Sequence, residues 1–232
     1  MRQAVILAGG KGIRMLPLTK YVPKPMIKIN NKPFLWYLLK NLEKAKYERV
    51  LLVVGHKKNV AEEFFMNTNF KFEKEVIHQS KRLGTGHAIK IVEKSIKNNF
   101  VVIMGDNLYS EKDLKDIKWD NNFSYVFAVK HKHPERFGVL RTKGDYLIEI
   151  QEKPEIPPTN LINSGLYKFT PEIFCALKKI KKSKRGEYEL TAAISLLAED
   201  KKVKVEQIHD YWIDLGRLED VPKVSESVKK NF

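Results

Sequence analysis

Leu7-Ala8-Gly9-Gly10-Lys11-Gly12-Ile13-Arg14 is the stretch that decides the fold of this chain, and it follows a short apolar run. The run predicts a buried strand at residues 4–8 that ends in three glycines and two cations. Glycine has no Cβ, so the backbone can adopt a positive φ and bring N–H groups close to anionic oxygens. The spacing matches neither a Walker loop nor the dinucleotide fingerprint. Taken alone, the stretch fits a tight turn as well as a phosphate-binding loop.

Outward from this loop, apolar runs alternate with apolar residues at helical spacing. The expected elements are strands at 50–54, 75–78 and 100–104 and helices at 34–46, 60–65 and 86–96. Alternation of this kind predicts an α/β protein with a parallel sheet. Ligands in such sheets bind at the carboxyl ends of the strands. We therefore expect Gly9, Gly55, Gln79 and Asp106 near one rim.

Beyond Asp106 the pattern changes to short strands with turns between them. They are expected at 125–129, 138–141, 146–151 and 164–169, followed by helices at 171–180 and 189–198, a strand at 203–207 and a last helix from 218. Short strands joined by turns indicate mixed or antiparallel pairing. With 232 residues the chain can bury a full core, and we expect a single domain over 1–232.

The charge of the chain is unusual. Its 43 Lys and Arg against 28 Asp and Glu give a net charge of +15, which would attract nucleic acid, an anionic membrane or small anionic substrates. The lysines are dispersed, and the sequence has no zinc-finger, helix-turn-helix or RNP pattern, so we assign most of them to solvated surface and expect no nucleic-acid partner.

One cysteine, Cys175, excludes a disulfide within the chain. No apolar run approaches the ~20 residues that span a bilayer, and nothing resembles a signal peptide. We therefore expect a cytoplasmic protein without membrane contact.

Two further runs, Pro17-Leu18-Thr19 and Pro23-Lys24-Pro25-Met26, extend the opening stretch. Together they resemble the signature of the sugar-1-phosphate nucleotidyltransferases, L-A-G-G-x-G-T-R-[LM]-x-P-L-T followed by P-K-P-[ML]. The chain departs from it at Ile13, where the family usually has Thr. The resemblance continues to Gly216 and is closest to glucose-1-phosphate thymidylyl- and uridylyltransferases, without the C-terminal β-helix of bifunctional relatives.

The resemblance implies a Rossmann-like α/β/α sandwich around a mixed, mainly parallel sheet. It also implies a nucleotide-binding N-terminal half, with residues 107–216 on the sugar-phosphate side. The implied nucleotide-binding residues are Leu7, Ala8, Gly9, Gly10, Lys11, Gly12, Gln79, Gly84 and Thr85. The implied catalytic residues are Arg14, Lys24 and Asp106.

A magnesium site is expected on two carboxylates. Asp106 directly follows an apolar strand, where it suits Mg²⁺ and equally suits the capping of a turn. Asp214, in Trp212-Ile213-Asp214-Leu215-Gly216, resembles the family's late W-x-D-x-G segment. The resemblance implies that this second carboxylate joins Asp106 at the metal.

The base subsite is expected at Gln79 and at Leu83-Gly84-Thr85-Gly86-His87-Ala88. A glutamine amide offers a donor and an acceptor, which suits uracil or thymine. The structural alternative, without a role in binding, is a polar loop that precedes a helix. By resemblance, a glutamine here is typical of uridylyl- and thymidylyltransferases, whereas guanylyltransferases more often have Glu.

The acceptor side carries the segments Arg136-Phe137-Gly138-Val139, Glu152-Lys153-Pro154 and Asn163-Ser164-Gly165-Leu166-Tyr167. By resemblance, Gly138, Glu152 and Asn163 contact sugar hydroxyls and Lys153 holds the sugar phosphate. A carboxylate is a good acceptor for hydroxyls and a lysine a suitable charge for a phosphate. Taken singly, Glu152 and Lys153 fit a surface charge pair. A helix start explains the segment 187–191, which we leave out of the site.

These observations predict a Mg²⁺-dependent enzyme that forms a nucleoside-diphosphate sugar and pyrophosphate from UTP or dTTP and a sugar 1-phosphate, with glucose 1-phosphate as acceptor. One alternative is a guanylyltransferase for mannose or heptose 1-phosphate. Another is an inactive regulatory subunit that binds a nucleotide sugar. The family also makes a homo-oligomer plausible.

Overall fold

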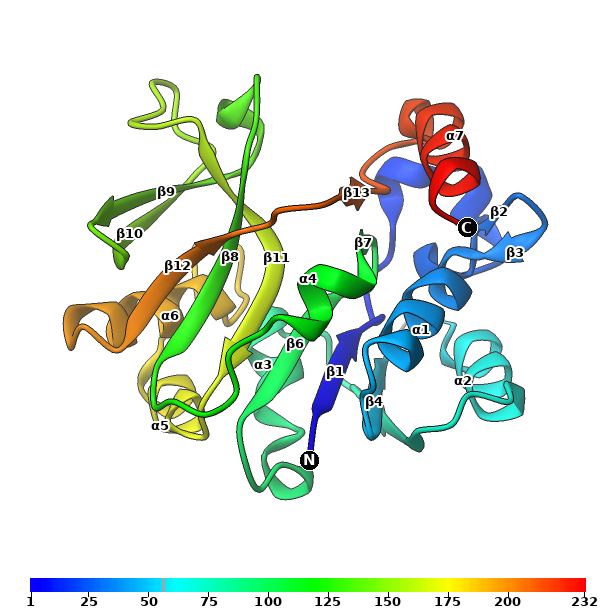
Figure 1. Ribbon diagram of the computed structural model, residues 1–232, viewed down its shortest axis with the longest axis horizontal. Helices are drawn as coiled ribbons and strands as arrows, with labels where there is room; N and C mark the ends of the chain where they lie inside the picture. The colour runs from blue at the N-terminus through cyan, green and yellow to red at the C-terminus, as the bar shows by residue number, and fades with distance from the viewer. Residues whose placement is uncertain (56) are drawn as a thin grey trace. The chain divides into compact units, whose positions relative to one another are not determined.

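The computed structural model describes residues 1–55 and 57–232, and its contacts divide the chain into two compact units. Unit 1 comprises Met1–Arg82, Ile103–Ile117 and Asp210–Phe232, and unit 2 comprises Leu83–Val102 and Lys118–His209. Strand β6 (Phe100–Met104) carries the chain from unit 2 into unit 1. In each unit helices pack against a sheet (Figure 1).

Unit 1 is built on three parallel strands in the order β5-β4-β1. Strands β1 and β4 are almost entirely buried, which explains their continuous apolar sequences, because parallel strands are covered on both faces. The elements of unit 1 are β1 (Gln3–Leu7), η1 (Ile13–Met15), η2 (Leu18–Lys20), η3 (Lys24–Met26), β2 (Lys28–Ile29), β3 (Lys32–Pro33), α1 (Phe34–Lys44), β4 (Arg49–Val54), α2 (Lys58–Asn67), β5 (Glu73–His78), β7 (Asn107–Tyr109), α4 (Glu111–Lys115), β13 (Trp212–Asp214), η6 (Leu218–Asp220) and α7 (Val221–Asn231).

Helix α1 buries one apolar stripe, as its spacing predicts. Phe34, Leu38 and Leu42 are fully buried, and helix α2 covers β4 and β5. Two asparagines, Asn30 and Asn31, take positive φ values of 46° and 67° between β2 and β3. These residues tolerate the left-handed conformation that tight hairpin turns require.

Unit 2 contains five strands in the order β11-β8-β12-β10-β9. The pairs β11–β8, β10–β12 and β10–β9 are antiparallel and the pair β12–β8 is parallel, which confirms the predicted change to mixed pairing. The elements of unit 2 are α3 (Thr85–Lys90), η4 (Glu93–Ser95), β8 (Ser124–Lys130), η5 (Pro134–Arg136), β9 (Gly138–Lys143), β10 (Tyr146–Glu152), β11 (Leu161–Phe169), α5 (Glu172–Lys179), α6 (Leu190–Glu199) and β12 (Val203–Gln207).

The helix expected at 86–96 is shorter than predicted. Helix α3 ends at Lys90, and a separate turn of 3-10 helix, η4, follows it. β-Branched residues lie at the break, Ile91 and Val92, and their restricted side chains lower helix propensity. Helices α3, α5 and α6 pack together, and α6 also contacts β10 and β12.

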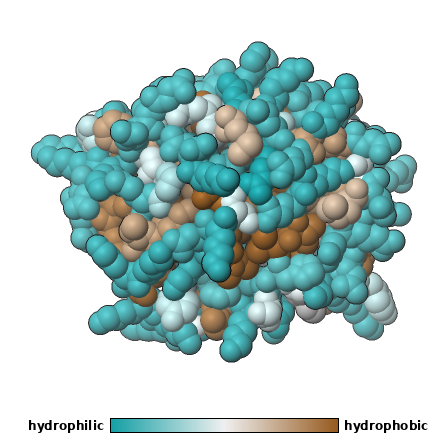
Figure 2. Space-filling view, turned by 90° about the horizontal axis from the view of Figure 1, so that it is seen from below, coloured by the Kyte–Doolittle hydropathy of each residue, from teal (hydrophilic) through white to brown (hydrophobic). Residues whose placement is uncertain are grey.

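The face drawn in Figure 2 is covered mostly by hydrophilic side chains, with short hydrophobic stretches between them. Within residues 1–55 and 57–232, no helix combines the length and the apolar character needed to cross a bilayer. Cys175 is a free, exposed thiol.

Candidate functional site

The carboxyl ends of β1, β4 and β5 meet at one rim of the sheet in unit 1. The backbone N–H of Ala8 donates to Val53 O and that of Gln79 to Val54 O, both over 2.8 Å. A Cβ atom on Gly9 would lie 3.1 Å from Oε1 of Gln79, whose side chain is buried. The structure therefore brings Gly9 and Gln79 together, as the alternation of strands and helices predicts.

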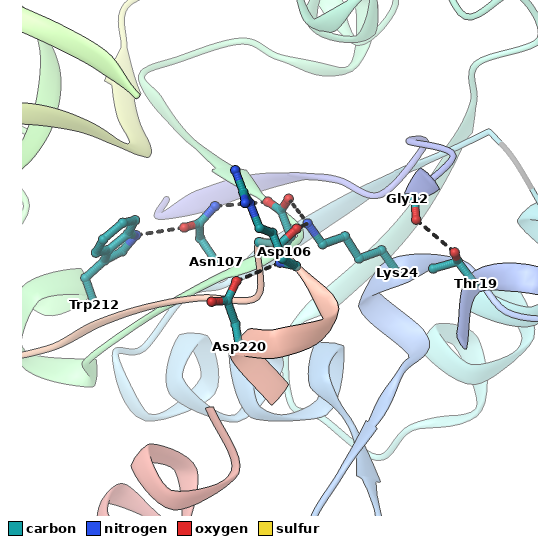
Figure 3. Close-up of polar contacts among 9 residues, drawn as sticks. Gly12, Thr19, Lys24, Asp106, Asn107, Trp212 and Asp220 are labelled. Carbon is teal, nitrogen blue, oxygen red and sulfur yellow. Dashed lines mark hydrogen bonds and ion pairs between the residues drawn. The ribbon is translucent and has the colours of Figure 1, made fainter. Parts of the chain in front are cut away.

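The glycine loop is shaped by Gly12, which has a φ of +62°. A Cβ at this position would lie 2.8 Å from Cγ2 of Thr19, so glycine is required for both conformation and space. The Thr19 hydroxyl donates to Gly12 O over 2.8 Å (Figure 3). Ile13 is 66% exposed and Arg14 is also exposed. The departure from the family signature at Ile13 therefore leaves the core unaffected.

Lys24 is a buried cation at the start of η3. Its ammonium donates to Oδ2 of Asp106 over 2.8 Å and to Gly216 O over 3.3 Å (Figure 3). Its side chain is 10% exposed and that of Asp106 is 30% exposed. The structure thus joins two of the predicted catalytic residues in an ion pair that is largely shielded from water.

Asp214 lies beside this ion pair. In the antiparallel ladder of β13 and β7 it pairs with Asn107, and the N–H of the next residue, Leu215, donates to Asp106 O over 2.9 Å. Burial and the negative charge of Asp106 raise the pKa of Asp214 to about 7, although Lys24 opposes the shift. The structure therefore holds two carboxylates close together, and their electrostatic repulsion would be lowered by a bound cation.

Gly216 allows a third carboxylate to approach. A Cβ on Gly216 would lie 2.8 Å from Oδ2 of Asp214 and 3.1 Å from Oδ2 of Asp220. Asp220 accepts a hydrogen bond from the backbone N–H of Arg217 over 2.7 Å (Figure 3). Its charge further raises the pKa of Asp214.

Sequence reasoning missed two residues that orient Asp106. The indole N–H of Trp212 donates to Oδ1 of Asn107 over 2.7 Å, and the Asn107 amide donates to Oδ1 of Asp106 over 2.9 Å (Figure 3). Asn107 is buried and Trp212 is half-buried. The tryptophan of the W-x-D-x-G segment could have indicated a hydrogen-bond donor near Asp214, but the sequence does not show that its acceptor is Asn107.

The carboxylates of Asp106 and Asp214 fit a magnesium ion. Mg²⁺ is commonly held by one or two carboxylates together with substrate phosphates and water. Among the described residues, no group of three or more His, Cys, Asp or Glu side chains is arranged to hold a metal ion by itself. The pair is therefore suited to a cation that arrives with a phosphate ligand.

In unit 2 the predicted base loop packs against the segment 187–191, which sequence analysis left out of the site. Gly84 has a φ of +97°, and a Cβ there would lie 2.6 Å from Tyr188 O and 2.9 Å from Cβ of Glu187. The hydroxyl oxygen of Thr85 accepts the N–H of Leu190 over 3.1 Å, at the start of α6. This segment therefore shapes the loop, and Glu187 lies directly beside Gly84.

The predicted sugar-binding residues of unit 2 also lie together. Gly138 pairs with Glu152 in the β9–β10 ladder, and a Cβ on Gly138 would lie 3.3 Å from Oε2 of Glu152 and 3.7 Å from Cβ of Asn163. The Asn163 amide donates to the Tyr167 hydroxyl over 2.8 Å and accepts the N–H of Gly165 over 3.0 Å. Both ends of the Asn163 side chain are therefore oriented by β11 itself.

Lys153 has a left-handed backbone with a φ of +48° and is followed by Pro154. This conformation is strained for a residue other than glycine. The Lys153 N–H donates to Phe137 O over 2.9 Å, and its side chain is exposed. Such strain persists where the surrounding structure imposes it, which is frequent at ligand sites.

Comparison with known proteins identifies the family. The model of the nucleotidyl transferase family matches residues 3–231. The chain belongs to this family. The family that the motifs predict is thereby confirmed, and the Rossmann-like mixed α/β fold is confirmed by solved structures of similar proteins.

Two curated relatives match most of this chain. The chain is 41% identical over 221 residues to the bifunctional protein GlmU of Methanocaldococcus jannaschii, covering 94% of this chain and 52% of that protein. It is 34% identical over 226 residues to the UTP–glucose-1-phosphate uridylyltransferase AglF of Haloferax volcanii, covering 94% of this chain and 93% of that protein. The chain thus spans about half the length of the bifunctional relatives it matches.

Among solved structures, the chain is similar to a UDP-glucose pyrophosphorylase crystallised with UDP-glucose. The TM-score is 0.89 at 27% identity, and the match covers 100% of both chains.

Proposed function

We propose that this nucleotidyl transferase joins a nucleoside triphosphate to a sugar 1-phosphate and releases pyrophosphate. The observation that carries the proposal is the cluster of the buried Lys24 with the half-buried Asp106 and Asp214 in unit 1, the unit that also carries the glycine loop. A cation and two carboxylates of this kind suit phosphoryl chemistry, in which catalysis depends mostly on alignment and charge neutralisation.

In the proposed reaction, an oxygen of the sugar phosphate attacks the α-phosphorus in line. A new P–O bond forms while the bond to the bridging oxygen breaks, and the electron pair leaves with pyrophosphate. The exposed Arg14 neutralises the leaving group. Lys24 exchanges its carboxylate partner for phosphate oxygens, because its ammonium needs an anionic acceptor in this buried position. Asp106 and Asp214 would hold Mg²⁺, which supplies further charge neutralisation when bound.

We assign UTP or dTTP as the donor. Gln79 is buried at the strand rim beside Gly9, where an amide can pair with both a donor and an acceptor on a base. In unit 2, Gly84 has a φ of +97°, which glycine adopts without strain, and its backbone carries no side chain. The names of AglF and of the similar UDP-glucose enzyme support uracil as the base.

The acceptor is glucose 1-phosphate in this proposal. Glu152 and Asn163 lie next to Gly138, so a carboxylate and an amide can reach the hydroxyls of one sugar ring. Lys153 supplies the charge for the phosphate.

The test is pyrophosphate release from Mg²⁺, glucose 1-phosphate and each of UTP, dTTP, GTP, CTP and ATP. Release with UTP or dTTP, lost in Asp106→Asn and retained in Asp116→Asn, supports the proposal. Asp116 is a matched control because it is an exposed aspartate of the same unit. Release with GTP alone would replace the donor assignment by a guanylyltransferase, to be repeated with mannose and heptose phosphates. Nucleotide binding without release from any donor would indicate a regulatory subunit.

A further inference from the structure

The segment from Ile13 to Tyr21 continues the glycine loop and is held by few apolar contacts. Met15 and Thr19 are its two buried residues, whereas Ile13 is 66% and Tyr21 is 73% exposed. Such limited burial contributes little to the stability of a loop conformation, so hydrogen bonds must hold the loop in place. Arg14, assigned to the leaving group, lies within this segment.

One such polar contact joins the segment to Gly12, the residue directly before it. The Thr19 hydroxyl donates to Gly12 O, and Cγ2 of Thr19 fills the space beside the missing side chain of Gly12. This contact couples the two ends of the loop to each other. It leaves open what fixes the loop to the rest of unit 1.

Lys57 supplies that second contact. Its ammonium donates to Thr19 O over 2.7 Å and also to Lys20 O. Lys57 lies in the turn between β4 and α2, with a φ of +52°, and acts as the N-terminal cap residue of α2. The accepting carbonyls belong to the end of η2, where a short helix leaves its carbonyls without partners of its own.

We infer that Lys57 is a positioning residue that holds the segment from Ile13 to Tyr21, the continuation of the glycine loop, against the β4–α2 turn. Hydrogen bonds from a charged donor are roughly twice as strong as neutral ones, and two acceptors on consecutive residues fix both position and direction. The inference rests on the proposed function, because it assigns the held loop to the polyphosphate of the nucleotide. No role is assigned to Lys57 in contact with substrate.

The experiment compares Lys57→Met, Lys57→Arg and the control Lys58→Met. Methionine and arginine are unbranched at Cβ like lysine, so the left-handed backbone at position 57 is equally strained in each. Lys58 is the exposed next residue, and its ammonium lies 3.5 Å from the His78 ring instead of on the loop. Two readouts are taken: hydrogen exchange of residues 12–21 without substrate, and the KM values for nucleotide and sugar phosphate.

In Lys57→Met we expect the backbone amide hydrogens of residues 12–21 to exchange about tenfold faster than in the wild-type protein, because two charge-assisted hydrogen bonds are lost. Its KM for the nucleotide should rise by a similar factor while the KM for the sugar phosphate stays unchanged. Lys57→Arg, which can still donate to both carbonyls, should restore both values, and Lys58→Met should match the wild type.

Unchanged exchange of residues 12–21 in Lys57→Met would overturn the inference, as would an equal rise of both KM values. The exchange readout needs no turnover. If the wild-type protein releases no pyrophosphate, the proposed function fails. In that case faster amide exchange of residues 12–21 in Lys57→Met still supports the positioning role of Lys57, and unchanged exchange contradicts it.

Discussion

Replacing Asp214 by asparagine should make the metal-free protein more stable at alkaline pH. Burial and the charge of Asp106 raise the pKa of Asp214 to about 7 from its ordinary value of 3.8. The folded protein therefore binds this proton more tightly than the unfolded chain does. The stability that the bound proton provides is fully present below the unfolded pKa and is lost as pH rises through the folded pKa.

The size of the effect follows from the two pKa values. One pKa unit corresponds to about 1.4 kcal/mol. Between about pH 5.5 and about pH 8, Asp214 alone should lower the free energy of unfolding of the wild-type protein by about 2 kcal/mol. Asparagine does not titrate, so the advantage of Asp214→Asn over the wild type should grow by about 2 kcal/mol across this range.

The assay is urea unfolding followed by circular dichroism, in chelator, at both pH values. Asp116→Asn, which changes an exposed aspartate of the same unit, is the control, and its stability difference from the wild type should stay the same at both pH values. Adding Mg²⁺ should stabilise the wild type more than Asp214→Asn, because one of the two carboxylates is gone. A stability difference that stays constant or shrinks as pH rises would refute the reasoning.

Three further substitutions test other contacts. Trp212→Phe removes the indole N–H at the head of the hydrogen-bond chain that orients Asp106, so turnover should fall by about tenfold while the unfolding midpoint barely moves; an unchanged kcat would contradict that chain. Lys153→Gly relieves a φ of +48° and should stabilise the protein by about 1 kcal/mol in urea unfolding, yet raise the KM for the sugar phosphate. Lys168 is buried, and its ammonium donates to Asn121 O over 2.8 Å, so Lys168→Met should lower the free energy of unfolding by about 2 to 3 kcal/mol without changing either KM; equal stability would show that this ammonium is dispensable.

Much of the scaffold follows from local periodicity. The strands at 100–104 and 203–207 are found with the bounds that their sequences predict. The first is a short apolar run, and the second begins with valines at alternate positions, Val203 and Val205. The helix predicted at 86–96 was wrong beyond Lys90, since helical spacing of apolar residues continues through a β-branched pair that the backbone does not accommodate. Periodicity thus reports which faces are apolar and reports helix ends poorly.

The sequence by itself determined the family and predicted the glycine loop and the two carboxylates of the proposed site, because these are properties of local patterns and their order. Only the tertiary structure decided which atoms meet. Lys24 donates to Gly216 O, which lies 192 positions away in the sequence. Trp212 donates to Asn107, 105 positions away, because β13 pairs with β7, and no local pattern encodes the register of these two short strands. The same holds for the pKa of Asp214, which depends on burial and on the distance to Asp106, and for the hold of Lys57 on the segment from Ile13 to Tyr21. These properties arise when segments far apart in the chain pack side by side.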